Sequence, residues 1–77
     1  MAKDDYIKEL AKLGKRIRAV RKARNLTQVD LELLCNINHG DISRIENGQK
    51  NIELHTIIKL ARALEVEIFE LFTPEKG

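Results

Sequence analysis

The stretch that most constrains this chain is residues 27–48, TQVDLELLCNINHGDISRIENG. It opens on Thr27, a favourable helix N-cap, and Asp30 lies three residues further on, which is the spacing of a capping box. Asn36 follows where a short helix must end, and asparagine tolerates the left-handed conformation that such an ending needs. The stretch therefore predicts a helix that begins after Thr27 and stops at a tight break around Asn36.

A second short helix is predicted immediately after this break. Asn38 is another N-cap residue, and Asn47-Gly48 is a pair that typically ends a helix. Asp41 lies three positions after Asn38, and we expect its side chain to cap the Asn38 backbone. Each of the two helices carries an apolar face at helical spacing. The residues of these faces are Leu31, Leu34, Ile42 and Ile45.

Helical periodicity extends over three further segments, residues 5–24, 53–64 and 68–72. Asn25 is expected to close the first of them in a left-handed conformation. The apolar stripes are Tyr6, Leu10, Leu13, Ile17 and Val20, then Leu54, Ile57, Ile58, Ala61 and Leu64, then Ile68, Leu71 and Phe72. If the last stripe faces the core, Phe69 points elsewhere. No segment has the pattern of a strand, so the sequence predicts an all-α fold.

Length and composition agree with one small intracellular domain. The 77 residues make a single domain, residues 1–77. Cys35 is the one cysteine, so no disulfide can form within the chain and a reducing compartment is favoured. No apolar run is long enough to span a bilayer, and the N-terminus leads into no apolar region of a secretory signal. We therefore expect a cytoplasmic protein.

Charge is unevenly distributed along the chain. The net charge is +2, yet residues 1–24 hold nine of the fourteen Lys and Arg and only three of the twelve Asp and Glu. A basic front end and an acidic remainder suggest one face for a polyanion and another for something else. The solvated face of an amphipathic helix would give the same pattern, so charge alone leaves both interpretations open.

Residues 27–48 resemble the helix-turn-helix of the lambda-repressor-like, Cro/C1-type DNA-binding domains (the XRE family). The flanking segments match that family in the same register, so the resemblance covers residues 13–72. It implies a compact five-helix lambda-repressor-like domain with a central helix-turn-helix. The matching residues are Thr27-Gln28, Leu31, Ile37, Ile42-Ser43-Arg44-Ile45-Glu46, Asn47-Gly48, Leu13-Gly14-Lys15-Arg16-Ile17-Arg18, Arg21, Leu60-Ala61, Ala63-Leu64, Val66 and Leu71-Phe72.

The resemblance implies binding to double-stranded DNA, with the second helix of the motif in the major groove. The family's base-contacting positions correspond to His39, Gly40 and Arg44, and Ser43 could contact a base or a phosphate. Arg44 suits guanine, because its planar fork matches O6 and N7; contact with a phosphate is the alternative. His39 could instead be exposed to water only, and for Asp41, which we expect to cap Asn38, contact with a cytosine is the alternative. Phosphate contacts, which position the protein without reading sequence, map to Thr27, Gln28, Asn47, Lys50 and Asn51.

Two further positions depend on the resemblance. The family pairs the position of Arg21 with the acidic residue that is Glu46 here, which implies a structural salt bridge, at least partly buried. Two separate surface charges are the alternative. Glu32 departs from the family, which prefers a small residue where the two helices of the motif touch. Its carboxylate must therefore reach water or a hydrogen-bond donor.

A homodimer on a palindromic operator is the next inference, because one helix reads only a few base pairs. We expect the interface in the C-terminal segment, through Ile68, Phe69 and Phe72, together with the helix at residues 53–64. Phe69 is the most informative of them, since it would be exposed in a monomer. Packing within one chain is the alternative.

Other functions remain open within the same fold. The chain could be the antitoxin of a toxin–antitoxin pair, a controller of a restriction–modification system, or a protein-interaction module without DNA binding. An enzyme is not expected, because the chain has no Gly-rich phosphate loop and no assembled catalytic triad. Cys35 and His39 straddle the break, two ligands short of a zinc site, so neither a metal nor a cofactor is expected. Cys35 is instead interpreted as a small buried apolar residue.

Overall fold

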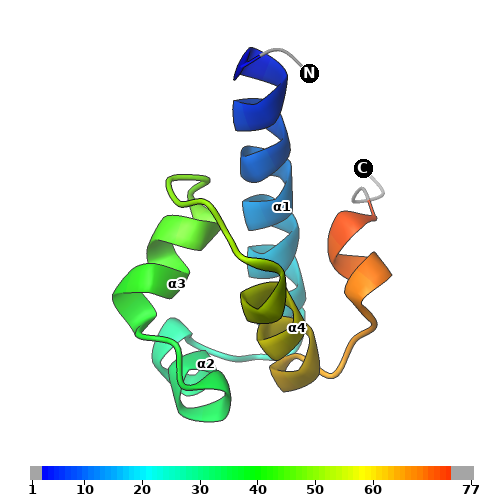
Figure 1. The fold of residues 1–77 in the computed structure, drawn as a ribbon. Coiled ribbons are helices and arrows are strands. Elements are labelled where there is room, and N and C mark those ends of the chain that lie inside the picture. Colours follow the sequence, from blue (N-terminus) through cyan, green and yellow to red (C-terminus); the bar gives the residue numbers. More distant parts are fainter. Residues whose placement is uncertain (1–2, 74–77) are drawn as a thin grey trace.

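The computed structural model describes residues 3–73 and contains four α-helices followed by one short 3₁₀ helix (Figure 1). The helices are α1 (Lys3–Ala23), α2 (Gln28–Cys35), α3 (His39–Glu46), α4 (Leu54–Ala63) and η1 (Ile68–Phe72). No strand occurs in this part of the chain, and the all-α prediction is confirmed. The expected count of five helices is not, since the last element is a single 3₁₀ segment.

The elements pack around α1, the long helix that stands between α3 and η1 in Figure 1. α3 and η1 both pack against α1, while α4 packs against α2 and η1. The space between them is filled by a single cluster of buried side chains. Its members are Leu13, Ile17, Val20, Leu31, Cys35, Ile42, Ile45, Ile57, Leu60, Ala61, Leu64 and Leu71.

Several apolar residues that the sequence assigns to the core are exposed instead. On α2 the buried pair is Leu31 and Cys35, because residues four apart share one face of a helix, and Leu34 is turned to solvent. In η1 only Leu71 is buried. The other core predictions that the structure contradicts are Tyr6, Leu54, Ile68 and Phe72. Tyr6 is exposed because the first turns of α1 project beyond the elements that pack on it (Figure 1).

A residue in the left-handed conformation lies at or just after the end of α1, α2 and α4. Asn25 has φ 58° and Asn36 has φ 59°, as the sequence predicts. Glu65, after α4, also has φ 59°, which is uncommon for a residue with a long side chain. Arg24 holds it in place, donating from Nη1 to the Glu65 carboxylate at 2.8 Å and from Nη2 to the Glu65 carbonyl at 3.0 Å.

The crossing of α1 and α3 depends on Gly14. A Cβ at this position would lie 2.4 Å from the backbone oxygen of Ile45 and 2.6 Å from that of Glu46. Hydrogen in place of a side chain therefore lets α3 approach the backbone of α1 closely.

No helix within residues 3–73 combines the length and apolarity that crossing a membrane requires.

Candidate nucleic-acid interface

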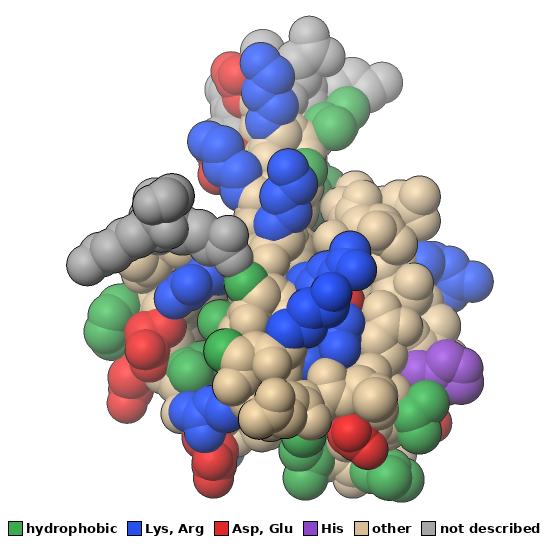
Figure 2. Space-filling view, turned by 180° about the vertical axis from the view of Figure 1, so that it is seen from behind, with side chains coloured by type: hydrophobic (Ala, Val, Ile, Leu, Met, Phe, Trp, Pro, Cys, Tyr) green, Lys and Arg blue, Asp and Glu red, His purple; other side chains and the backbone are tan. Residues whose placement is uncertain are grey.

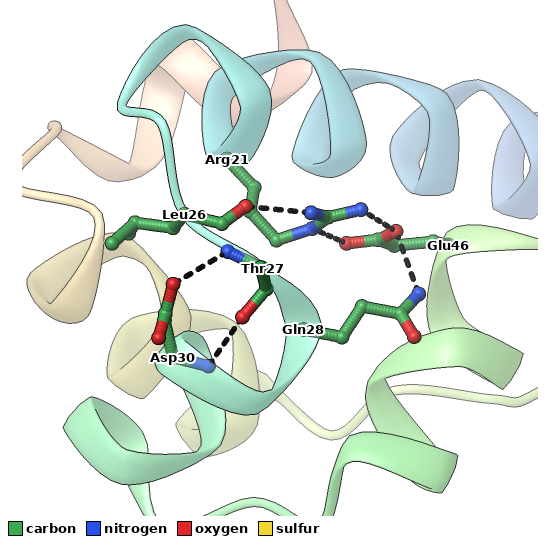
Figure 3. Close-up of polar contacts among 6 residues, drawn as sticks. All are labelled: Arg21, Leu26, Thr27, Gln28, Asp30 and Glu46. Atoms are coloured by element: carbon green, nitrogen blue, oxygen red, sulfur yellow. Dashed lines mark hydrogen bonds and ion pairs between the residues drawn. The ribbon is translucent and has the colours of Figure 1, made fainter.

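The helix-turn-helix begins with the capping box that the sequence predicts. The Asp30 N–H donates to Thr27 Oγ1 at 3.0 Å, and the Thr27 N–H donates to Asp30 Oδ2 at 2.9 Å (Figure 3). The Thr27 backbone hydrogen bond lowers the pKa of the Asp30 carboxyl, because it favours the charged form. Thr27 is itself exposed, so the first turn of α2 is open to solvent.

A buried ion pair fixes α3 relative to α1 (Figure 3). Arg21 donates from Nε and Nη2 to the two carboxylate oxygens of Glu46, at 2.7 and 2.9 Å, and from Nη1 to the Leu26 carbonyl at 2.7 Å. Only 7% of Arg21 and 5% of Glu46 is exposed. The hydrogen bond to Glu46 raises the pKa of Arg21. The expected salt bridge is thus present, bidentate and buried.

Gln28 joins this ion pair to the start of α2. Its side-chain amide donates from Nε2 to Glu46 Oε1 at 3.1 Å (Figure 3). The structure thus places Gln28 as a support for α3. One amide proton is used in this contact, and an amide NH₂ carries two. Gln28 can therefore support α3 and donate outward at the same time.

The start of α3 is capped differently from the sequence prediction. The Asn38 side chain accepts from the Gly40 N–H at 2.8 Å, and Asp41 does not cap the Asn38 backbone. A Cβ on Gly40 would lie 2.9 Å from Asn38 Oδ1, so the glycine leaves room for this cap. The prediction that Asp41 caps the Asn38 backbone is wrong, because the Asp41 carboxylate contacts Arg44 and Lys50 instead.

Glu32, the departure from the family pattern, supplies a second contact at the start of α3. Its Oε1 accepts from the His39 N–H at 3.0 Å and lies 2.7 Å from His39 Nδ1. These hydrogen bonds from His39 lower the pKa of the Glu32 carboxyl. Glu32 therefore has the donors that a carboxylate at this contact needs, and it ties His39 at the start of α3 to α2.

Asp41 joins two residues predicted to contact DNA. Its Oδ1 lies 2.8 Å from Arg44 Nη1 and 3.3 Å from Lys50 Nζ. The hydrogen bond from Lys50 and its positive charge, with a smaller effect of Arg44, lower the pKa of Asp41. Sequence reasoning did not identify this contact, although an Asp and an Arg three residues apart on a helix are the signal for it.

The remaining predicted contacts lie around these groups. Ser43 is half-buried and Asn47 is exposed at the end of α3. Asn51, in the loop after α3, accepts a hydrogen bond from the Tyr6 hydroxyl at 3.1 Å. His39, Arg44 and Lys50 are exposed as well. The predicted base-reading residues therefore lie on α3, with Asn47, Lys50 and Asn51 at its end and in the following loop, while Thr27 and Gln28 lie at the start of α2.

An open hollow connects this surface to α1. Lys22, Thr27, Gln28 and His39 line it, where the end of α1 meets the starts of α2 and α3. Figure 2 shows Lys and Arg side chains in a line along α1 on the same face as a histidine. Among the residues of α1 whose side chains are described, the exposed cations are Lys8, Lys12, Lys15, Arg18 and Lys22. The charge distribution along the sequence suggested a face for a polyanion here but did not single out Lys22, which lies beside the capped start of α2.

The arrangement holds no metal-binding cluster among the residues whose side chains are described. Cys35 is buried in the core, and burial raises the pKa of its thiol. A buried thiol of this kind is a small apolar group rather than a ligand or nucleophile. Polar donors and cations on an exposed helix face suit recognition of a polyanion, not catalysis.

Comparison with known proteins agrees with this geometry. The helix-turn-helix family HTH_3 matches residues 17–71. The crystal structure of the restriction–modification controller protein C.AhdI from Aeromonas hydrophila has a TM-score of 0.80 and 41% identity, over 82% of this chain and 96% of that one. The controller protein C.Esp1396I, crystallised as a tetramer in complex with its natural 35 base-pair operator, has a TM-score of 0.74 and 26% identity, over 83% and 95% of the two chains.

A longer relative shares only part of its length with this chain. The immunity repressor protein of Bacillus phage phi105 is 38% identical over 56 residues, which are 73% of this chain and 39% of the repressor. The match of the family to most of the chain, together with the shared fold, establishes which family the chain belongs to. The chain belongs to the helix-turn-helix family of the Cro/C1 type, a class of DNA-binding transcriptional regulators and not of enzymes.

Proposed function

We propose that this chain is a sequence-specific regulator that binds a palindromic operator as a homodimer, with α3 in the major groove. Residues 1–77 would act as a single DNA-binding domain in the cytoplasm. The observation that carries the proposal is the buried Arg21–Glu46 pair, which fixes α3 against α1 and leaves its polar outer face exposed. A recognition helix has to be held rigidly in this way, because base contacts tolerate little error in position.

Base reading is assigned to the exposed face of α3. Arg44 is the principal reader, with guanine as its preferred base. His39 and Ser43 are further contacts near it. Gly40 has no side chain for a base, and its role is to admit the Asn38 cap and a close approach of the helix to DNA.

Phosphate contacts are assigned to both sides of the recognition helix. On one side Thr27 and Gln28 present the start of α2, where free N–H groups and the helix dipole favour an anion. Lys22 lies in the same hollow and adds a charge. On the other side the contacts are Asn47, Lys50 and Asn51.

A second copy of the chain is the proposed protein partner. Ile68, Phe69 and Phe72 are three exposed apolar side chains on one short element. Operator binding by the tetrameric relative C.Esp1396I supports recognition by more than one copy. A twofold dimer would place two α3 helices on half-sites about one helical turn apart, roughly 34–36 Å.

Selection of duplexes from a random-sequence library tests the proposal, with wild type and Arg44→Ala run side by side. Wild type is expected to recover a palindromic consensus, and Arg44→Ala to relax one symmetric position, losing about 1–3 kcal/mol of discrimination there. Lys59→Ala is a matched control, since Lys59 is an exposed cation on α4, away from α3. If wild type recovers no consensus at moderate salt, the proposal fails, and a protein partner such as a toxin becomes the better alternative.

A further inference from the structure

The side chains of Arg44 and Lys50 meet at a single oxygen. Asp41 Oδ1 contacts Arg44 Nη1 at 2.8 Å and Lys50 Nζ at 3.3 Å. Asp41 and Arg44 both lie on α3, and Lys50 comes from the loop after it. The carboxylate thus ties the proposed guanine reader and a proposed phosphate contact to one point on the recognition helix.

The way in which Arg44 is held leaves its other edge available. Asp41 uses only Nη1, and no hydrogen bond among the described residues involves Nε or Nη2 of Arg44. These two groups form the parallel pair of donors that matches O6 and N7 of guanine. Arg21 shows the same division within this molecule, with Nη1 on the Leu26 carbonyl and the Nε–Nη2 edge bidentate on Glu46.

The carboxylate also changes the local charge. Arg44 and Lys50 alone would present two positive charges to any phosphate backbone, and binding of that kind is insensitive to sequence. Asp41 offsets one of them and restricts two long side chains that would otherwise sample many conformations. Both effects weaken binding to arbitrary DNA more than binding to a site where Arg44 meets its guanine.

We propose that Asp41 is a positioning residue for sequence recognition, which anchors Arg44 and Lys50 so that the Nε–Nη2 edge of Arg44 faces the base. This inference rests on the proposed function and deepens it, because it assigns specificity to a residue that itself touches no base. It places the source of discrimination in an acidic side chain on the DNA-facing helix, where a negative charge would otherwise only oppose binding.

Asp41→Asn tests the proposal by the ratio of affinities for the selected operator and for a scrambled duplex of the same length. The variant is expected to bind the scrambled duplex more tightly and to lose about ten-fold in the ratio, the lower end of what a bidentate arginine–guanine pair supplies. Glu9→Gln is the matched control. Glu9 pairs with Lys12 three residues along an exposed helix face, so this variant makes the same change in net charge away from α3. It is expected to leave the ratio unchanged.

Two further variants separate position from charge. Asp41→Glu keeps the charge but moves the carboxylate, and the ratio is expected to fall while the salt dependence stays as in wild type. In an Arg44→Ala background, Asp41→Asn is expected to leave the ratio unchanged, because there is no reader left to position. The positioning role of Asp41 is overturned, with the proposed function left standing, by either of two results. One is that Asp41→Asn changes the ratio equally with and without Arg44. The other is that it changes the ratio no more than Glu9→Gln does. Failure of wild type to prefer any duplex would overturn the proposed function, and this inference with it.

Discussion

Arg21 and Glu46 are charged side chains in an otherwise apolar interior. Burying a charge is costly unless it is paired and hydrogen-bonded, and here each polar atom of the pair has a partner. Arg21 reaches Glu46 and the Leu26 carbonyl, and Glu46 also accepts from Gln28. The pair therefore acts as a specific connection between α1, α2 and α3, not as a general source of stability.

Removing one partner should be severely destabilising. Arg21→Met would leave the Glu46 carboxylate buried without its guanidinium, and we expect the free energy of unfolding to fall by about 3–5 kcal/mol. Urea unfolding followed by circular dichroism measures this. Lys12→Met, in the exposed Lys12–Glu9 pair, is the control and should change stability by less than about 1 kcal/mol. A similar loss of unfolding free energy in both variants would show that the buried pair contributes no more to stability than the exposed one.

The capping box at the start of α2 predicts a pH dependence. The folded-state pKa of Asp30 is lowered by its hydrogen bonds with Thr27. Its contribution to stability is therefore complete above the ordinary Asp pKa of about 3.9, and is lost as the pH falls through the lowered value. A carbon-13 carboxyl titration should give Asp30 a midpoint below the ordinary one. In Thr27→Ala the midpoint should move up towards it, and an unshifted midpoint in wild type would contradict the capping geometry.

The contact between α1 and α3 leaves no room for a side chain at Gly14. Gly14 lies against the backbone oxygens of Ile45 and Glu46, which cannot move without moving α3 itself. The recognition helix is therefore positioned by a close backbone approach on one side and by the Arg21–Glu46 pair further along α1.

Gly14→Ala tests this contact. We expect the free energy of unfolding to fall by about 3 kcal/mol, the upper end of overpacking effects, because the new Cβ meets backbone. Gly40→Ala is the control at the start of α3. There the Cβ meets only the end of the Asn38 side chain, which can shift, and alanine favours the helix by up to ~1 kcal/mol. Thermal unfolding of both variants compares them, and an equally mild effect of Gly14→Ala would show that α1 and α3 can separate without cost.

Among the described residues, large apolar side chains are exposed on α1, α2, α4 and η1. Phe69, 69% exposed, lies on η1 with Ile68 and Phe72, and Leu33, 80% exposed, lies on α2. η1 packs against α1 and α4, on the side of the molecule away from the helix-turn-helix (Figure 1). An interface at η1 would therefore leave both α3 helices of a dimer available to DNA.

Phe69→Asp should weaken the dimer. A charge in the centre of an apolar interface has no partner there, so we expect the dimer dissociation constant to rise at least ~100-fold, about 2.7 kcal/mol. Sedimentation equilibrium measures it. Leu33→Asp makes the same substitution at a more exposed apolar residue on α2, and should leave the dissociation constant unchanged. If Leu33→Asp dissociates the dimer and Phe69→Asp does not, the interface lies on α2 instead.

The sequence by itself determined the features that depend on neighbours within one helical turn. The capping box of Thr27 and Asp30, the left-handed Asn25 and Asn36, and the limits of α2 and α3 follow from short-range backbone hydrogen bonding. The family resemblance added the Arg21–Glu46 pairing, which spans 25 positions and which no local pattern would predict. The polar face of α3 was also predictable from the sequence, because its residues lie off the helix face that carries the buried Ile42 and Ile45.

Only the tertiary structure decided which apolar residues are buried and which polar groups meet. Leu34 and, in the last segment, Ile68 and Phe72 are exposed although the sequence assigns them to the core, because burial depends on where α4 and α1 lie and not on helical period alone. Glu32 meets His39 across the break, and Lys50 reaches back to Asp41 from the next loop. A side chain selects its partner from whatever the fold brings within about 3 Å, and that set is defined only once the helices have packed.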